Sequence, residues 1–196
     1  TKKIEREEYM KVKEIISLAL TFLNKEELAS FTPFGENSTV PELEAKEILK
    51  LKKCFNLVYN EIAVSYLPLV KSEDVLFING VLPYANISKN ITEVRKLYAN
   101  GKNVPYTIEE DGIHANILCA KLTYNYVPNE LDFEDEVFMF GGKLQERVLA
   151  YGIAMEYCLI SGLYDDAEVW ETRFYSGLRD ACLKKSEIRI PVRRWI

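Results

Sequence analysis

The chain has 196 residues, of which 48% are hydrophobic and 28% charged, so it has enough apolar material for a core and is not a disordered chain. Its formal net charge of −5 argues against a general nucleic-acid binder, because such a protein needs a basic surface that displaces counterions from phosphates. Twelve tyrosines and nine phenylalanines predict large packing surfaces, some of them interfaces.

The first apolar stripe follows helical spacing over residues 4–23. Its members recur every three or four residues and are Tyr9, Val12, Ile15, Ile16, Ala19, Phe22 and Leu23. This period predicts an amphipathic helix. Pro33 and Gly35 follow, so residues 24–40 are predicted to form a loop with a short helical turn at residues 26–30.

Neither a membrane span nor a signal peptide is indicated by this end of the sequence. The apolar stretch at residues 15–23 is too short to cross a bilayer. The first eight residues are mostly charged and lack the apolar core of a signal peptide. We therefore expect the chain to be intracellular when it is synthesised.

A second, longer helix is predicted to start near Pro41 and to end at Pro68. Proline is tolerated in the first turn of a helix, and it disfavours the helical conformation of the residue before it. The apolar stripe of this helix is formed by Ile48, Leu51, Phe55, Val58, Ile62 and Tyr66.

The pattern then changes to short β-branched and aromatic runs over residues 75–127. Asn100-Gly101 and Asp111-Gly112 each lie between two such runs, and both dipeptides suit the positive φ angles of a type I′ turn. Asn79-Gly80 marks an earlier hairpin, and residues 122–127 form a further strand. This segment is predicted to be an antiparallel meander.

Two more helices follow an acidic stretch at residues 130–136. The first is predicted to end at Gly162, a plausible C-terminal cap, and the second to begin with Asp165 as its N-cap. The short connection predicts an antiparallel helical hairpin.

The last eleven residues, 186–196, alternate apolar and polar side chains and predict an extended arm. A frayed basic end is one interpretation. The other is an arm that adds a strand to a neighbouring subunit, because extended arms bind through main-chain hydrogen bonds and Arg and Trp are enriched at interfaces. The candidate partner-binding residues are Arg189, Arg193, Arg194, Trp195 and Ile196.

The predicted fold class is α+β: a bundle of about four helices with an inserted antiparallel β-meander and an extended C-terminal tail. Residues 1–70 and 137–185 are assigned to the helical domain, residues 71–136 to the inserted meander, and residues 186–196 to the arm.

Residues suited to catalysis or metal binding form no recognisable motif. His114, the single histidine, lies in a strand without a nucleophile motif and is interpreted as a strand-edge residue. The acidic clusters at residues 109–111, 130–136 and 165–168 do not match a calcium loop and are interpreted as solvated turns and helix starts. Gly141-Gly142-Lys143 lacks the spacing of a phosphate-binding loop.

The four scattered cysteines, at positions 54, 119, 158 and 182, are interpreted as buried reduced thiols. We predict that the protein is not an enzyme and has no catalytic residues, cofactor or metal.

The order of elements resembles the head-to-tail adaptors of short-tailed bacteriophages, the tail tubular protein A or gatekeeper group. The resemblance covers nearly the whole chain and rests on four segments rather than on one strict motif. These are the helix with LKKCFNLVYNEIA, the strands of VRKLYANGKNVPYTI and DGIHANI, the strand and acidic exit LTYNYVPNELDFEDE, and the closing hairpin LQERVLAYGIAMEYCLISGLYDDAEVWETRFYSGLRDA. The short basic tail has no match in that pattern.

The resemblance implies a structural virion protein without catalysis. Such adaptors form a dodecameric ring below the portal protein, extend the channel through which the genome is ejected, and provide the platform for the tail nozzle protein. DNA would pass without specific binding, which suits an acidic chain because acidic walls repel phosphates. The expected location is the neck of the virion, and the host cytoplasm during assembly.

Three alternatives remain open from the residues alone. One is another virion ring component, such as a stopper, a tail terminator or a capsid-associated protein. Another is a small non-viral enzyme or ligand-binding domain that gathers carboxylates in a cleft between helices and sheet. A third is an interaction domain of a bacterial host.

Overall fold

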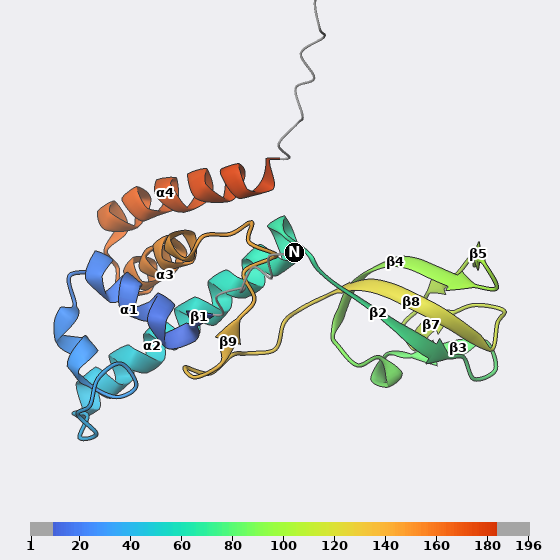
Figure 1. The fold of residues 1–196 in the computed structure, drawn as a ribbon, viewed down its shortest axis with the longest axis horizontal. Helices are drawn as coiled ribbons and strands as arrows, with labels where there is room; N and C mark the ends of the chain where they lie inside the picture. Colours follow the sequence, from blue (N-terminus) through green and yellow to red (C-terminus); the bar gives the residue numbers. More distant parts are fainter. Residues whose placement is uncertain (1–9, 184–196) are drawn as a thin grey trace, which may run out of the picture.

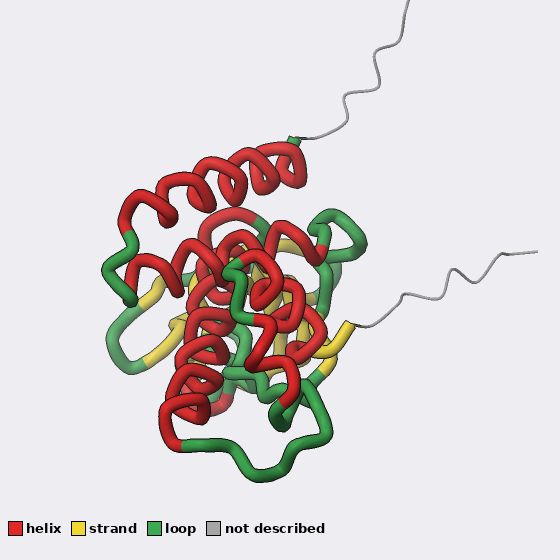
Figure 2. The backbone as a smooth tube through the Cα atoms, turned by 90° about the vertical axis from the view of Figure 1, so that its left-hand side faces the viewer, coloured by secondary structure: helices red, strands yellow, loops and turns green. Residues whose placement is uncertain are grey.

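The computed structural model describes residues 10–183 and has helices at one end and strands at the other (Figure 1). The predicted α+β class is confirmed, with four α-helices and antiparallel strands among the described residues. Seen from the helical end, the helices lie in front and the strands lie behind them (Figure 2). Two separate clusters of buried apolar side chains match this division, one within the helices and one between the strands.

The helical domain is built around α3 (Glu146–Ile160), which packs against α1 (Val12–Phe22), α2 (Glu42–Glu61) and α4 (Tyr164–Cys182). A side chain at Gly152 of α3 would clash, because its Cβ would lie 2.6 Å from Val58 of α2 and 2.8 Å from Phe174 of α4. Glycine at this position therefore lets both neighbouring helices approach α3 closely.

The second helix keeps nearly its predicted length, although α2 passes into a π-helical turn, η2 (Ile62–Tyr66), before Pro68. The predicted helical turn after α1 is present as the 3₁₀ segment η1 (Glu26–Ser30). Both α2 and η1 therefore lie where the local sequence pattern predicts them.

The start of the first helix was predicted wrongly within the described residues. Met10–Lys11 forms a short strand, β1, that pairs with β9 (Glu136–Val137), and α1 begins only at Val12. The N–H groups of Val12 and Lys13 have no partner inside the helix, and they donate to the carbonyls of Asp135 and Phe133, each over 3.1 Å. A segment about 120 residues later in the chain thus fixes where α1 begins.

The hairpin of α3 and α4 is confirmed, and so is Gly162 as its cap. Gly162 has a φ of +74°, and the N–H of Leu163 donates to the carbonyl of Cys158 over 2.9 Å. Together with the bond from Gly162 to Leu159, this is a Schellman motif. Asp165 is not the N-cap, because α4 begins at Tyr164 after Leu163.

The β domain holds two sheets. The larger one has the order β2–β8–β4–β5, formed by Leu69–Leu76, Cys119–Tyr126, Ile91–Ala99 and Lys102–Asn103. The smaller one has the order β3–β7–β6, formed by Val81–Pro83, Gly112–His114 and Thr107–Ile108. A 3₁₀ turn, η3 (Tyr84–Asn86), follows β3. All the pairings in these sheets are antiparallel.

The strand order is not that of a simple sequential meander, because β8 lies between β2 and β4. Leu69 at the start of β2 pairs with Tyr126 at the end of β8. The chain therefore enters and leaves the β domain on adjacent strands, which is how the domain can be inserted between two helices of one bundle.

Two of the predicted turn dipeptides have the expected backbone, and the third does not. Both residues of Asn79-Gly80 and of Asn100-Gly101 have positive φ angles. In the β6–β7 hairpin, Glu109 and Gly112 form the closing pair, so the loop residues are Glu110 and Asp111. Gly112 is needed for another reason: a Cβ there would lie 2.3 Å from the carbonyl oxygen of Leu82 on β3.

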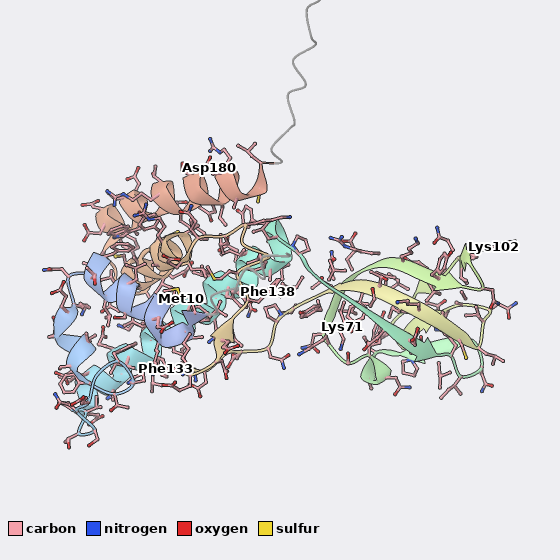
Figure 3. The ribbon with its side chains drawn as sticks, viewed as in Figure 1. Met10, Lys71, Lys102, Phe133, Phe138 and Asp180 are labelled. Atoms are coloured by element: carbon pink, nitrogen blue, oxygen red, sulfur yellow. The ribbon has the colours of Figure 1, made fainter. Side chains whose placement is uncertain are left out.

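The boundary of the inserted domain lies earlier than residue 136. Asn56 of α2 is buried and exchanges two hydrogen bonds with the main chain of Leu131, at 2.8 and 3.1 Å. Phe133 lies among the helical elements (Figure 3) and packs on their core. The return segment therefore belongs with the helices, and strand β8 ends the insert at Tyr126.

A polar network around Glu73 of β2 fastens the η3 segment to the large sheet. The carboxylate accepts hydrogen bonds from the hydroxyls of Ser88 and Tyr124 and from the Ser88 N–H, and it lies 3.4 Å from the Lys71 ammonium. Burial alone would raise the pKa of Glu73, but these partners stabilise the charged form and lower its pKa from 4.5 to about 2.

We expect the Glu73 network to make folding stability depend on pH in acid. Because its folded pKa lies below its unfolded value, Glu73 stabilises the protein above pH 4.5, and this contribution is lost as pH falls toward about 2. Denaturant unfolding between pH 2 and 7 should show a smaller acid-dependent loss for Glu73→Gln than for the wild type. The matched control is Asp74→Asn, which changes the adjacent exposed carboxylate. Parallel curves for the wild type and Glu73→Gln would contradict the assignment.

Candidate functional site

A groove lies where the helical and β domains meet, with a volume of about 750 Å³. Its lining comes from both domains and includes Tyr66, Val70, Arg95, Phe138, Lys143 and Cys182. Phe138 is about half exposed and lies in the helical domain, on the side toward the β domain (Figure 3). The groove also borders the end of α4, beyond which the predicted arm begins.

Hydrogen bonds hold the sides of this groove in place. The guanidinium of Arg95 donates to the side chain of Asn125, whose amide donates to Glu93 over 2.7 Å. On the helical side, the hydroxyl of Tyr59 donates to the carbonyl of Phe138 over 3.2 Å, and burial raises the pKa of Tyr59 to about 12. The groove therefore combines apolar and aromatic side chains with a positioned cation.

Two groups of exposed apolar side chains lie at opposite ends of the molecule. The hairpin corner is the turn between α3 and α4 and consists of Leu159, Ile160, Leu163 and Tyr164. The distal tip is the end of β2 with the turn before β8 and consists of Leu76, Ile78 and Leu118. The α3–α4 turn and the end of β2 lie toward opposite ends of the long axis in Figure 1.

The distal tip is a continuous feature because main-chain pairing joins its two segments. The N–H of Phe77 donates to the carbonyl of Leu118 over 2.8 Å, and Leu76 pairs with Cys119. Phe77 is buried, whereas its neighbours Leu76 and Ile78 are exposed by 66% and 63%. Alternation along the strand therefore directs two large apolar side chains outward at the same place.

A third apolar group lies along α2 and its π-helical continuation, η2. Leu49, Leu57 and Val64 are each about half exposed and are separated by eight and seven residues, so they recur about every two helical turns. We call them the α2 face. Grouped apolar side chains of this kind are typical of contact surfaces, whereas single exposed ones are ordinary.

The structure describes only some of the residues for which the sequence predicts a role. Arg189, Arg193, Arg194, Trp195 and Ile196 lie outside the described residues, so the predicted role of the arm stays a prediction. Gly141 and Gly142 form a turn that leads toward α3. The four cysteines are free, but only Cys54 and Cys158 are buried, so the prediction was wrong for Cys119 and Cys182.

The apolar ends were missed by sequence reasoning. Leu76, Ile78 and Leu118 lie within the predicted β segment at residues 75–127, and Leu159 lies within the helix predicted to end at Gly162. The exposure of these residues depends on which neighbours cover them, and periodicity alone does not give that. The groove between the domains likewise depends on how the two domains pack together, and no local sequence pattern gives that arrangement.

None of the α-helices in the described part of the chain is both long enough and apolar enough to cross a membrane. Neither a scan against models of known protein families nor a search of curated proteins gives a match for this chain.

Proposed function

We propose that this protein is a head-to-tail adaptor of a short-tailed bacteriophage, a structural subunit that forms a ring below the portal protein. The ring extends the DNA channel and carries the tail nozzle protein. The observation that carries this proposal is the pair of exposed apolar groups at opposite ends of an elongated subunit. A connector needs two such surfaces because it binds a different layer of the particle at each end.

The order of elements supports the same proposal. A helical bundle interrupted by an antiparallel β domain, and closed by a helical hairpin, is the arrangement implied by the resemblance to these adaptors. Entry and exit on paired strands make the β domain an appendage of the bundle, available for contacts that the helices do not make.

A ring also needs contacts between neighbouring subunits. In a closed ring, one patch of each subunit meets a different patch on the next. The α2 face and the groove between the domains consist of different residues and suit such heterologous contacts. The arm is a further candidate for contacts with a neighbour or with the portal.

The identity test is electron microscopy of the full-length chain, alone and mixed with the portal protein of the same phage. The expected result is a ring of twelve subunits on the portal, with or without prior ring formation by the free protein. A ring of different symmetry would favour another neck component and overturn the adaptor proposal. Absence of any complex with the portal would overturn it as well.

We expect substitutions at the two ends to separate two binding activities. Leu163→Asp changes the hairpin corner and Leu76→Asp changes the distal tip, and both positions are largely exposed, so both variants should fold. Each variant should bind one of the two partners, the portal protein or the nozzle protein, at least tenfold more weakly than the wild type. Its affinity for the other partner should be unchanged, and co-sedimentation measures both.

The first control is a charge change at a residue that belongs to none of the three apolar groups. Lys102→Glu at the exposed β4–β5 turn should bind both partners normally. Deletion of residues 187–196 tests the arm in the same assay and is expected to weaken ring formation or portal binding while leaving the fold intact. If both end variants bind both partners like the wild type, the two-ended proposal is wrong.

A further inference from the structure

The β6–β7 hairpin brings together three side chains that can bind a metal ion. The Nε2 atom of His114 lies 2.7 Å from a carboxylate oxygen of Asp111 and 3.8 Å from one of Glu109. One ligand atom from each of the three residues lies within 4.8 Å of the other two. The sequence placed the acids in a solvated turn and the histidine at a strand edge, without connecting them.

The spacing of these atoms is close to that of a metal coordination sphere. In a tetrahedral zinc site with bonds of about 2.1 Å, ligand atoms are about 3.4 Å apart. The observed separations of 2.7 and 3.8 Å lie on either side of that value. The shorter one is a hydrogen bond between His114 and Asp111, which a bound ion would replace. Three protein ligands leave the fourth position for water or for a group from another molecule.

The backbone of the hairpin holds these residues in a defined place. Glu109 and Gly112 exchange main-chain hydrogen bonds of 2.9 and 3.3 Å across the two-residue loop. The hydroxyl of Tyr84 donates to the carbonyl of Glu109 over 2.8 Å, and β7 pairs with β3 on its other side. The three side chains therefore project from a fixed turn and a paired strand rather than from a long loop.

The side chains themselves remain accessible. His114 is partly exposed, and Glu109 and Asp111 are more exposed, so an ion can reach them without unfolding of the hairpin. An imidazole nitrogen among the ligands favours a transition metal such as Zn²⁺ over Mg²⁺ or Ca²⁺, which prefer oxygen ligands alone.

We propose that Glu109, Asp111 and His114 form a surface site for a divalent transition metal, with Zn²⁺ as the matching ion. His114 would bind through Nε2 and each acid through one carboxylate oxygen. This site is separate from the adaptor proposal and does not depend on it.

The test uses the untagged full-length protein, because a histidine tag would bind the same ions. Isothermal titration with zinc chloride should give one site, and His114→Gln and Asp111→Asn should each weaken that site at least tenfold. Glu110→Gln is the matched control, since it removes a charge from the same loop at a residue outside the cluster.

A second measurement avoids substitutions altogether. His114 is the single histidine, so its imidazole signals in a nuclear magnetic resonance titration report on this site alone. The exposed thiols of Cys119 and Cys182 cannot produce those signals. Stoichiometric Zn²⁺ should shift them, and Mg²⁺ at the same concentration should not. Unshifted imidazole signals, or equal zinc affinity of the wild type and His114→Gln, would overturn the proposal.

Discussion

Replacing Phe174 with alanine is expected to lower the free energy of unfolding by about 3–5 kcal/mol. Phe174 is fully buried on α4 and packs against Gly152 of α3, one of the positions where the two helices approach closely. The ring of Tyr175 lies beside it, with centroids 5.1 Å apart. Loss of the Phe174 ring leaves a cavity that the close helix contact cannot refill.

Chemical denaturation followed by circular dichroism measures this loss. Phe138→Ala is the matched control, because it removes the same group from a side chain that is about half exposed. The control should cost much less, since exposed positions lose little apolar burial. A loss at Phe174 no larger than the loss at Phe138 would contradict the argument from burial. The effect bears on function because α4 carries one side of the hairpin corner.

Replacing Asn56 with leucine is expected to lower the free energy of unfolding by about 2–4 kcal/mol. Asn56 is buried on α2, donates to and accepts from the main chain of Leu131, and also donates to the carbonyl of Lys52. Leucine has a similar volume but cannot make any of these bonds. The N–H and C=O of Leu131 then lose their partners, and this segment is what joins the β domain back to the helices.

Two further variants make this prediction specific. Asn56→Asp keeps an acceptor for the Leu131 N–H and should lose less stability than Asn56→Leu. Asn60→Leu, one helical turn later on α2 and only partly buried, tests the cost of the same substitution without the bridge to Leu131. If Asn56→Leu is as stable as the wild type, the bridge does not hold the return segment.

Local signals in the sequence predicted most of the elements. Gly162 was identified as a cap because a left-handed residue favours glycine, and the Schellman bonds confirm it. Asn100-Gly101 gave the β4–β5 turn for the same reason. In both cases the information lies within a few residues of the position, so the sequence contains it directly.

The candidate metal site was harder to predict because it depends on the exact register of one turn. Glu109, Asp111 and His114 are close in sequence, but their meeting depends on a turn one residue earlier than predicted. The centre of this turn was predicted at Asp111-Gly112, because Asp-Gly is a common dipeptide in two-residue hairpin turns. Close approach of β3 to Gly112 provides a different reason for that glycine.

By itself the sequence determined the α+β class, the helical hairpin and the turns that punctuate the β domain, since helix periods, caps and turn dipeptides act over a few residues. Tertiary structure decided the start of α1, the position of β8 between β2 and β4, and the return of residues 131–135 to the helices. Each of these depends on hydrogen bonds between residues about 20 to 120 positions apart, and such pairings follow from the packing of the whole chain rather than from any local pattern. The exposed ends of the subunit have the same origin, because a leucine becomes a surface residue only when nothing in the rest of the fold covers it.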